Sequence, residues 1–117
     1  MQFIRVTENL LYDLAGDPES AIVLRDKVTD YFKQYLRYWL KKDVDAIYFS
    51  DDYGTQRSLL ISPKMWRTFI KERYARLIAA FKAQNPALKI AYHCDGTIEP
   101  IIPDLIEIGL DVLNPIQ

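Results

Sequence analysis

Short apolar runs alternate with longer helical stripes along this chain of 117 residues, and the alternation restricts the fold more than any other feature. The runs are bounded by polar or turn residues and are apolar throughout, which is typical of strands buried on both faces. The segments between them carry apolar residues at three- and four-residue steps, which predicts amphipathic helices. Strands that alternate with helices favour parallel pairing through right-handed crossovers. The sequence therefore predicts an α/β fold.

The predicted order of elements is β-α-β-α-β-α-β. Four strands are expected, at residues 3–6, 45–50, 88–93 and 111–116. Two successive helices, at residues 7–15 and 18 to about 42, occupy the first helical place of this order, and single helices at residues 63 to about 84 and 98–109 occupy the other two. The polar residues just before the first three helices suit N-caps, with proline at the first position of the second and third: Thr7, Asp17 and Ser62.

Two architectures accommodate this order: an open doubly wound sheet, or part of a (β/α)₈ barrel. The 117 residues are too few to close an eight-stranded barrel, which takes about 200 residues or more. The chain also stops directly after a predicted strand. We therefore interpret residues 1–117 as one partial domain, a half barrel that belongs to a longer chain.

The composition excludes several classes of partner. With 15 basic and 16 acidic residues the formal net charge is −1, so nothing indicates nucleic acid. A single cysteine cannot form an internal disulfide, which fits a reducing compartment. The N-terminus lacks the pattern of a signal peptide, and no apolar run approaches the roughly 20 residues that span a bilayer. We expect a cytoplasmic protein without nucleic-acid or membrane partners.

Polar residues gather at the carboxyl ends of the predicted strands, where parallel α/β proteins place their functional groups. Asp51 and Asp52 directly follow the strand at 45–50. Adjacent carboxylates can act as general acid and base or bind a cation, but a simple turn before Gly54 explains the same residues. Arg57, in the same loop, can hold a substrate carboxylate or phosphate, or can be an ordinary solvated arginine.

The next strand end, residues 92–96 (YHCDG), holds the only histidine and the only cysteine of the chain. Side chains alternate along an extended backbone, so His93 and Asp95 project to one side and Cys94 to the other. His93 and Asp95 can supply two metal ligands, or a histidine with its orienting carboxylate. Cys94 then suits a small buried side chain. A histidine bonded to backbone is the alternative, and two ligands do not complete a zinc site.

The third strand end carries two amides, Asn114 and Gln117, on either side of Pro115. Amides at this position can form hydrogen bonds with a substrate. The aromatic residues on the stripe of the long predicted helix are interpreted as packing residues rather than as a stacking platform for a ligand: Tyr31, Phe32, Tyr35 and Trp39.

The same strand ends resemble the uroporphyrinogen decarboxylase superfamily. Residues 45–82 contain an Asp-Asp-x-Gly-x-Gln loop followed by Ser-Pro and a helix, as the middle of that superfamily does. Residues 91–117 resemble the next portion, His-x-Cys/Asp-Gly and then Pro-x₅-Gly-x-Asp-x-x-Asn-Pro-x-Gln, and residues 8–19 resemble the segment that precedes both. The resemblance covers nearly the whole chain and implies a (β/α)₈ barrel, of which this chain is the central to later part.

Two chemistries are implied by this resemblance. The decarboxylases remove carboxylates from a tetrapyrrole without a cofactor. The corrinoid-linked methyltransferases move methyl groups between a cobalamin-bearing protein and a thiol such as coenzyme M, and a His-x-Cys pair with a later Cys holds the zinc that activates the thiol. His93 corresponds to the first ligand, whereas Asp95 stands where a cysteine is expected and the third ligand falls beyond Gln117. Aspartate is a harder ligand, which favours another metal or none. The catalytic aspartate of the decarboxylases corresponds to no residue here.

We therefore expect a fragment of a methyltransferase-like enzyme of this superfamily, with a small molecule or a corrinoid protein as its partner. Its metal would be zinc or another divalent ion. Decarboxylation without a cofactor and a non-catalytic half-barrel module are the alternatives. The open sheet edges of a half barrel predict a homo-oligomer, and the isolated chain is expected to be inactive. The expected site residues are the catalytic Asp51, Asp52, His93 and Asp95, of which His93 and Asp95 are the metal ligands, and the substrate-binding Gln56, Arg57, Asn114 and Gln117.

Overall fold

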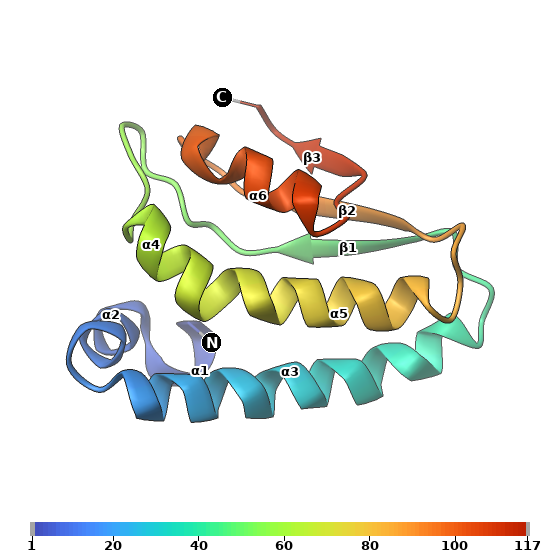
Figure 1. Cartoon of the computed structure of the whole chain (residues 1–117), viewed down its shortest axis with the longest axis horizontal. Helices are drawn as coiled ribbons and strands as arrows, with labels where there is room; N and C mark the ends of the chain where they lie inside the picture. The colour runs from blue at the N-terminus through green and yellow to red at the C-terminus, as the bar shows by residue number, and fades with distance from the viewer. Residues whose placement is uncertain (1, 117) are drawn as a thin grey trace.

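The chain folds as an α/β unit on a three-stranded parallel sheet with the strand order β1-β2-β3 (Figure 1). This computed structural model describes residues 2–116, with side chains from residue 4 onward. The strands are β1 (Ala46–Ser50), β2 (Lys89–His93) and β3 (Val112–Asn114). The helices are α1 (Gln2–Arg5), α2 (Thr7–Gly16), α3 (Pro18–Leu40), α4 (Pro63–Trp66), α5 (Glu72–Lys82) and α6 (Ile102–Glu107). A π-helical turn, Arg67–Lys71, joins α4 to α5, and a 3₁₀ turn, Glu99–Ile101, leads into α6.

The strand register brings the carboxyl ends of all three strands to one edge of the sheet. Ser50 of β1 is paired with His93 of β2, and His93 is paired with Asn114 of β3. Because the strands are parallel, the loops that follow them leave the sheet on the same side. The polar residues of these loops are therefore neighbours in space although they are far apart in the sequence.

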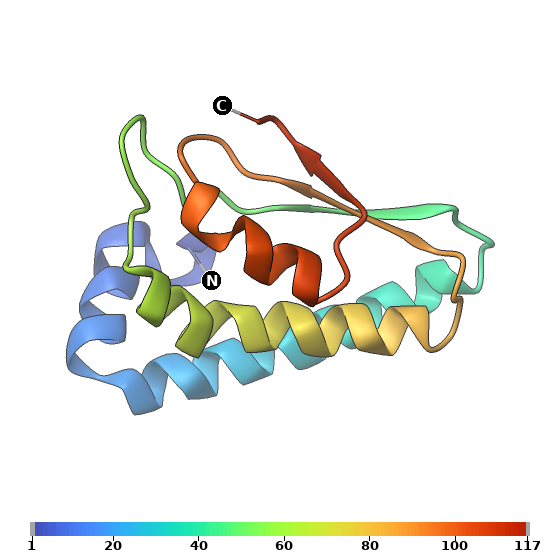
Figure 2. The same cartoon turned by 45° about the horizontal axis from the view of Figure 1, so that its top comes forward.

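Helices cover one face of the sheet, with α5 and α6 against the strands and α3 alongside α5 (Figures 1 and 2). Strand side chains that point to the helices are buried, among them Ile47, Ile90 and Tyr92. On the opposite face, Tyr48 is 60% exposed and Val112 is 49% exposed. Within the described residues this second face of the sheet is uncovered.

Two of the predicted capping residues begin their helices. The Asp17 carboxylate accepts a hydrogen bond from the Ser20 N–H (3.1 Å), and the Ser62 hydroxyl oxygen accepts one from the Met65 N–H (3.2 Å). Each bond satisfies a backbone donor that has no partner within the helix. The prediction for Thr7 was wrong, because no side chain caps the start of α2.

The predicted strand at residues 3–6 was wrong: the chain is helical there, in α1, and the sheet of the described residues has three strands rather than four. A strand forms only against a neighbour that completes its ladder of hydrogen bonds, and no such neighbour lies beside this segment in residues 2–116. The segment turns instead at Val6, whose φ is 64°, and Arg5 forms an ion pair with Asp13 of α2 (2.7 Å).

The aromatic stripe predicted for packing is only partly buried. Phe32 packs against the hydrophobic core, but Tyr31, Tyr35 and Trp39 are 63%, 49% and 43% exposed. The buried face of α3 lies further round the helix and includes Val28. Helical periodicity identified an apolar side of α3 but not the part of it that another element covers.

No helix within residues 2–116 combines the length and the apolar character needed to cross a bilayer.

Candidate metal centre

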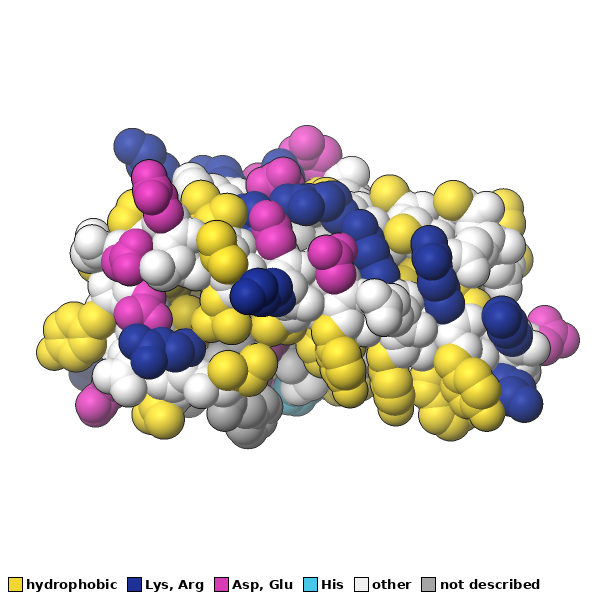
Figure 3. All heavy atoms as spheres, turned by 90° about the horizontal axis from the view of Figure 1, so that it is seen from below, with side chains coloured by type: hydrophobic (Ala, Val, Ile, Leu, Met, Phe, Trp, Pro, Cys, Tyr) yellow, Lys and Arg dark blue, Asp and Glu magenta, His cyan; other side chains and the backbone are white. Residues whose placement is uncertain are grey.

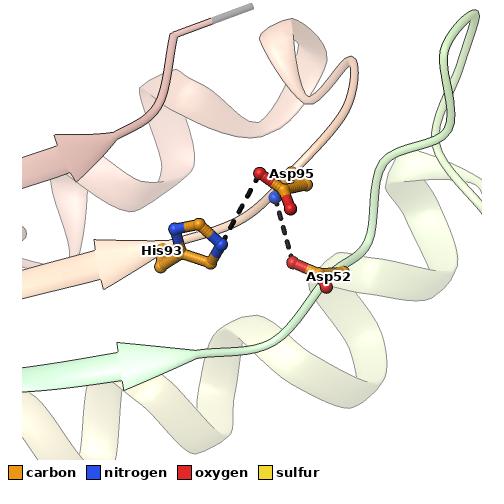
Figure 4. A group of neighbouring side chains, drawn as sticks. All are labelled: Asp52, His93 and Asp95. Carbon is orange, nitrogen blue, oxygen red and sulfur yellow. Dashed lines mark hydrogen bonds and ion pairs between the residues drawn. The ribbon is translucent and has the colours of Figure 1, made fainter.

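Three side chains with metal-binding atoms meet at the carboxyl edge of the sheet (Figure 4). Asp52 lies in the loop after β1, His93 is the last residue of β2, and Asp95 follows it in the next loop. One nitrogen or oxygen atom of each residue lies within 4.8 Å of the other two. Asp52 and Asp95 are exposed and His93 is half-buried, so the site is open to solvent on one side.

Backbone hydrogen bonds hold the two loops together. The Asp95 N–H donates to the Asp52 carboxylate (3.0 Å), and the Thr97 N–H donates to the carbonyl oxygen of Thr55 (2.8 Å). The first of these bonds fixes one oxygen of Asp52 directly beside Asp95. The position of Asp52 is therefore set by the second loop as well as by its own strand.

Two glycines allow this close approach. A Cβ atom built on Gly54 would lie 2.5 Å from the carbonyl oxygen of Asp95 and 2.5 Å from the carbonyl carbon of Gly96. Gly96 itself has a φ of 82°, a conformation that side chains disfavour. Glycine is thus required at both positions for the two loops to meet beside Asp52 and Asp95.

The amide of Asn114 fixes the orientation of the imidazole. The Asn114 side-chain oxygen lies 3.2 Å from His93 Nδ1, across the register of β2 and β3. Because an amide oxygen can only accept, Nδ1 carries the proton and donates it. The lone pair of neutral His93 then belongs to Nε2, which points toward the Asp95 carboxylate at 3.5 Å (Figure 4). Metal-binding histidines are oriented in the same way, by a hydrogen bond to the other ring nitrogen.

These donors fit a divalent cation. The Asp52 and Asp95 carboxylates and the His93 imidazole each bring one ligand atom within 4.8 Å of the other two, a spacing at which the three can hold one cation between them. A ligand set of one imidazole nitrogen and carboxylate oxygens suits zinc, manganese, cobalt or iron better than it suits a soft metal ion. Three protein ligands also leave coordination positions for water or a substrate, as in catalytic metal sites.

Asp51 points away from this centre. Its carboxylate accepts hydrogen bonds from the hydroxyls of Tyr74 and Tyr53 (3.4 Å for Tyr53) and pairs with the buried guanidinium of Arg73 (3.3 Å). Burial raises the pKa of both tyrosines well above the usual value of a phenol, so both hydroxyls remain protonated donors. The two adjacent aspartates therefore have separate places: Asp51 connects the end of β1 to α5, and Asp52 lies beside His93 and Asp95 in the candidate metal centre.

Cys94 lies in the core, as strand alternation predicts. Its side chain is fully buried, and its sulfur accepts a hydrogen bond from the Tyr53 N–H (3.2 Å). Burial raises the pKa of the Cys94 thiol, which keeps it protonated near neutral pH. The sulfur belongs to the packing of the sheet rather than to the ligand set.

The predicted substrate-binding residues are not all brought together. Gln56 and Arg57 are exposed in a turn that Thr55 organises, and Arg57 borders an open surface pocket of about 360 Å³. Asn114 contacts His93 instead of standing apart as a substrate ligand. Gln117 lies outside the described residues.

Sequence reasoning missed the contact between Asn114 and His93, and it did not single out Asp52 from Asp51. The contact between Asn114 and His93 had a signal in the sequence. Both residues end predicted parallel strands, and strands that are consecutive in an α/β chain are usually neighbours. The choice between the two aspartates had no such signal, because it depends on Arg73 and Tyr74 of α5 and on the Asp95 N–H of the second loop.

The chain was also compared with known proteins. A protein-family model described as Uroporphyrinogen decarboxylase (URO-D) matches residues 3–115. The chain belongs to this family. No curated protein and no solved structure gave a significant match. The superfamily resemblance predicted from the sequence motifs is therefore confirmed. The match spans Asp52, His93 and Asp95 of this URO-D chain.

Proposed function

We propose that this URO-D chain supplies the metal-binding part of the active site of a methyltransferase-like enzyme, within a (β/α)₈ barrel of which it forms about half. The parent enzyme would move a methyl group between a corrinoid-bearing protein and a thiol or similar acceptor. The observation that carries the proposal is the convergence of Asp52, His93 and Asp95, with His93 Nε2 turned toward the carboxylates. The uncovered face of the sheet, on which His93 lies, supports its place inside a larger barrel.

In this proposal the residues of the chain hold and orient the ion and the acceptor. Asp52 and Asp95 supply oxygen ligands, His93 supplies Nε2, and Asn114 keeps the imidazole in the tautomer that leaves Nε2 unprotonated. A divalent ion at this position, zinc or another, lowers the pKa of a thiol or water bound to it, so that the acceptor is present as its anion near neutral pH. The two carboxylates also offset the charge of the ion.

The transfer conserves both the number of bonds and the electron pairs. The methyl carbon exchanges its bond to the corrinoid cobalt for a bond to the acceptor sulfur. The electron pair of the broken bond stays on cobalt, and the sulfur supplies the pair for the new bond. The proton of the thiol leaves to solvent before the attack, since two of the three side chains at the site, Asp52 and Asp95, are exposed.

Decarboxylation is the second candidate, because the family model that matches the chain is named for it. The exposed Arg57 beside an open pocket suits a substrate that bears carboxylates. This chemistry needs no metal, so the response to a chelator separates the two candidates.

The test uses the full-length enzyme that contains this chain. Transfer of the methyl group from methylcobalamin to a thiol is followed by the change in corrinoid absorbance. His93→Ala should lower the rate by about a hundredfold or more, and a chelator should have a similar effect. Asp45→Asn, an exposed residue before β1 and away from the centre, should leave the rate unchanged. Release of CO₂ from uroporphyrinogen that resists chelation and His93→Ala would refute methyl transfer.

A further inference from the structure

A pocket of about 190 Å³ lies between α3, α5 and the end of β1, and the residues of the candidate metal centre do not line it. Its walls are mostly aromatic and are formed by Phe32, Tyr48, Phe49 and Tyr74. Tyr48 and Ser50, which also lines the pocket, are exposed, so solutes can enter from solvent. The one cationic side chain among the lining residues belongs to Arg73. The pocket thus combines apolar walls with a single positive charge.

Arg73 is buried in this pocket with part of its hydrogen-bonding capacity unused. Only 5% of the residue is exposed, and its guanidinium lies over the rings of Phe32 (5.7 Å) and Tyr74 (5.2 Å). Its Nη1 contacts the carboxylate of Asp51. Its Nε is buried and has no hydrogen-bond partner within the described residues. Because a buried donor without a partner is unfavourable, this edge of the guanidinium favours a further acceptor.

Asp51 compensates only part of the Arg73 charge. The distance from Nη1 to the Asp51 carboxylate is 3.3 Å, which is longer than the roughly 2.7–2.9 Å of a strong charge-assisted hydrogen bond. The same carboxylate oxygen also accepts hydrogen bonds from the hydroxyls of Tyr74 and Tyr53. Its negative charge is therefore shared among three donors, and the guanidinium retains positive charge that can attract an anion into the pocket.

Two other acidic side chains at the contact of α3 with α5 are held by other arginines. Asp26 and Glu72 each pair with both Arg25 and Arg76, at distances of 2.9–3.2 Å. Figure 3, seen from the side on which α3 lies, shows acidic side chains next to lysine and arginine side chains. Among the side chains of residues 4–116, the one carboxylate paired with Arg73 is the carboxylate described above.

We propose that this pocket binds a small carboxylic acid with a flat apolar body, in its ionised form. The Nε–H of Arg73 and the neighbouring terminal N–H are parallel donors, which match the two oxygens of a carboxylate. The flat body would pack against the aromatic walls. A volume of about 190 Å³ admits such an acid but no macrocycle, so the site differs from one that holds a tetrapyrrole. The proposal goes beyond methyl transfer and does not depend on it.

Titration of the chain with benzoate tests the proposal, followed by the ¹H–¹⁵N NMR signal of the Arg73 Nε–H. EDTA in the buffer keeps metal ions from binding the benzoate. We expect this signal to shift as the N–H donates to the carboxylate, with a dissociation constant on the order of 1 mM for so small a ligand. Benzamide has the same shape without the charge, so it should bind at least about tenfold more weakly.

Two substitutions on α5 locate the bound acid, with the backbone amide signals of β1 as the readout. Arg73→Lys keeps a positive charge beside Asp51 but loses the parallel donors, so benzoate should bind at least about tenfold more weakly. Arg76→Lys is the matched control. The Nε of Arg76 is also buried without a partner in the described residues, but Arg76 does not line the pocket, and the affinity should be unchanged. His93→Ala should also leave it unchanged, which separates this site from the proposed function.

Three results would overturn the proposal. Spectra that are unchanged at about 50 mM benzoate would exclude a site of the expected affinity. Equal affinities of the wild type and Arg73→Lys would place the acid elsewhere. Binding to the chain that is lost in the full-length protein would show that another segment fills the pocket. If circular dichroism shows that Arg73→Lys is unfolded, the wild type decides, because equal binding of benzoate and benzamide refutes a carboxylate site.

Discussion

Substitution of Gly54 by alanine should disrupt the metal centre and the fold together. The added Cβ would lie 2.5 Å from two backbone atoms of the opposite loop, the Asp95 oxygen and the Gly96 carbon. The loops would need to separate by about 1 Å to reach an ordinary contact distance of 3.4 Å. Overpacking of this kind costs about 1–3 kcal/mol, and loss of the hydrogen bond from Asp95 to Asp52 adds about 1 kcal/mol. We expect the free energy of unfolding to fall by about 2–4 kcal/mol.

The same movement should weaken metal binding by at least about tenfold, because ligand geometry tolerates displacements of only about 0.5 Å. Urea denaturation followed by tryptophan fluorescence measures the stability, and a cobalt(II) titration measures the affinity. Gly16→Ala is the matched control, because nothing lies within 4 Å of a Cβ atom there. It should leave stability unchanged or raise it by up to about 1 kcal/mol. A Gly54→Ala variant within 0.5 kcal/mol of wild type, with unchanged metal affinity, would refute the reasoning.

Three further predictions follow from single contacts. Asn114→Ala should weaken metal affinity by about 10- to 100-fold with little change in stability, because the imidazole loses the partner that orients it. The same cobalt(II) titration measures this loss. Equal affinities of the variant and the wild type would show that Asn114 does not orient His93 for metal binding. The pKa of Asp104 is lowered by its hydrogen bonds to Arg67 and Lys71, so its stabilising effect is present above about pH 4 and is lost as the pH falls further, through the lowered pKa. Thermal unfolding of Asp104→Asn should accordingly show a lower melting temperature at pH 7 and a weaker decline of that temperature toward pH 3 than the wild type does. Cys94 is fully buried, so a thiol reagent at pH 8 should label it at least about 100-fold faster in concentrated urea than in buffer; fast labelling of the native chain would contradict its place in the core.

Strand geometry made part of the candidate metal centre predictable from the sequence. Alternation along an extended backbone is a local rule, and it correctly separated His93 and Asp95 from Cys94. The rule does not apply to residues beyond the end of a strand. Asp51 and Asp52 follow β1, and their directions are decided by hydrogen bonds to residues of other elements. No local pattern encodes those partners.

The fold shows the same division between local and distant causes. The helix starts at Asp17 and Ser62 were predictable, because a cap needs only the next few residues. The strand expected at 3–6 depends on a neighbouring strand, and the sequence of the run itself does not show whether one is present. Exposure of Tyr31 and Tyr35 likewise depends on which elements surround α3. Periodicity alone does not supply that information.

Cobalt(II) binding to the chain tests the central claim most directly, because it measures the metal centre without requiring the rest of a barrel. The absorption spectrum of the cobalt complex should report one ion per chain. Asp52→Asn should weaken binding, His93→Ala should abolish it, and Asp45→Asn should leave it unchanged. A wild-type chain that binds no cobalt at about 1 mM, or a His93→Ala variant that binds as tightly as the wild type, would contradict a metal centre formed by Asp52, His93 and Asp95.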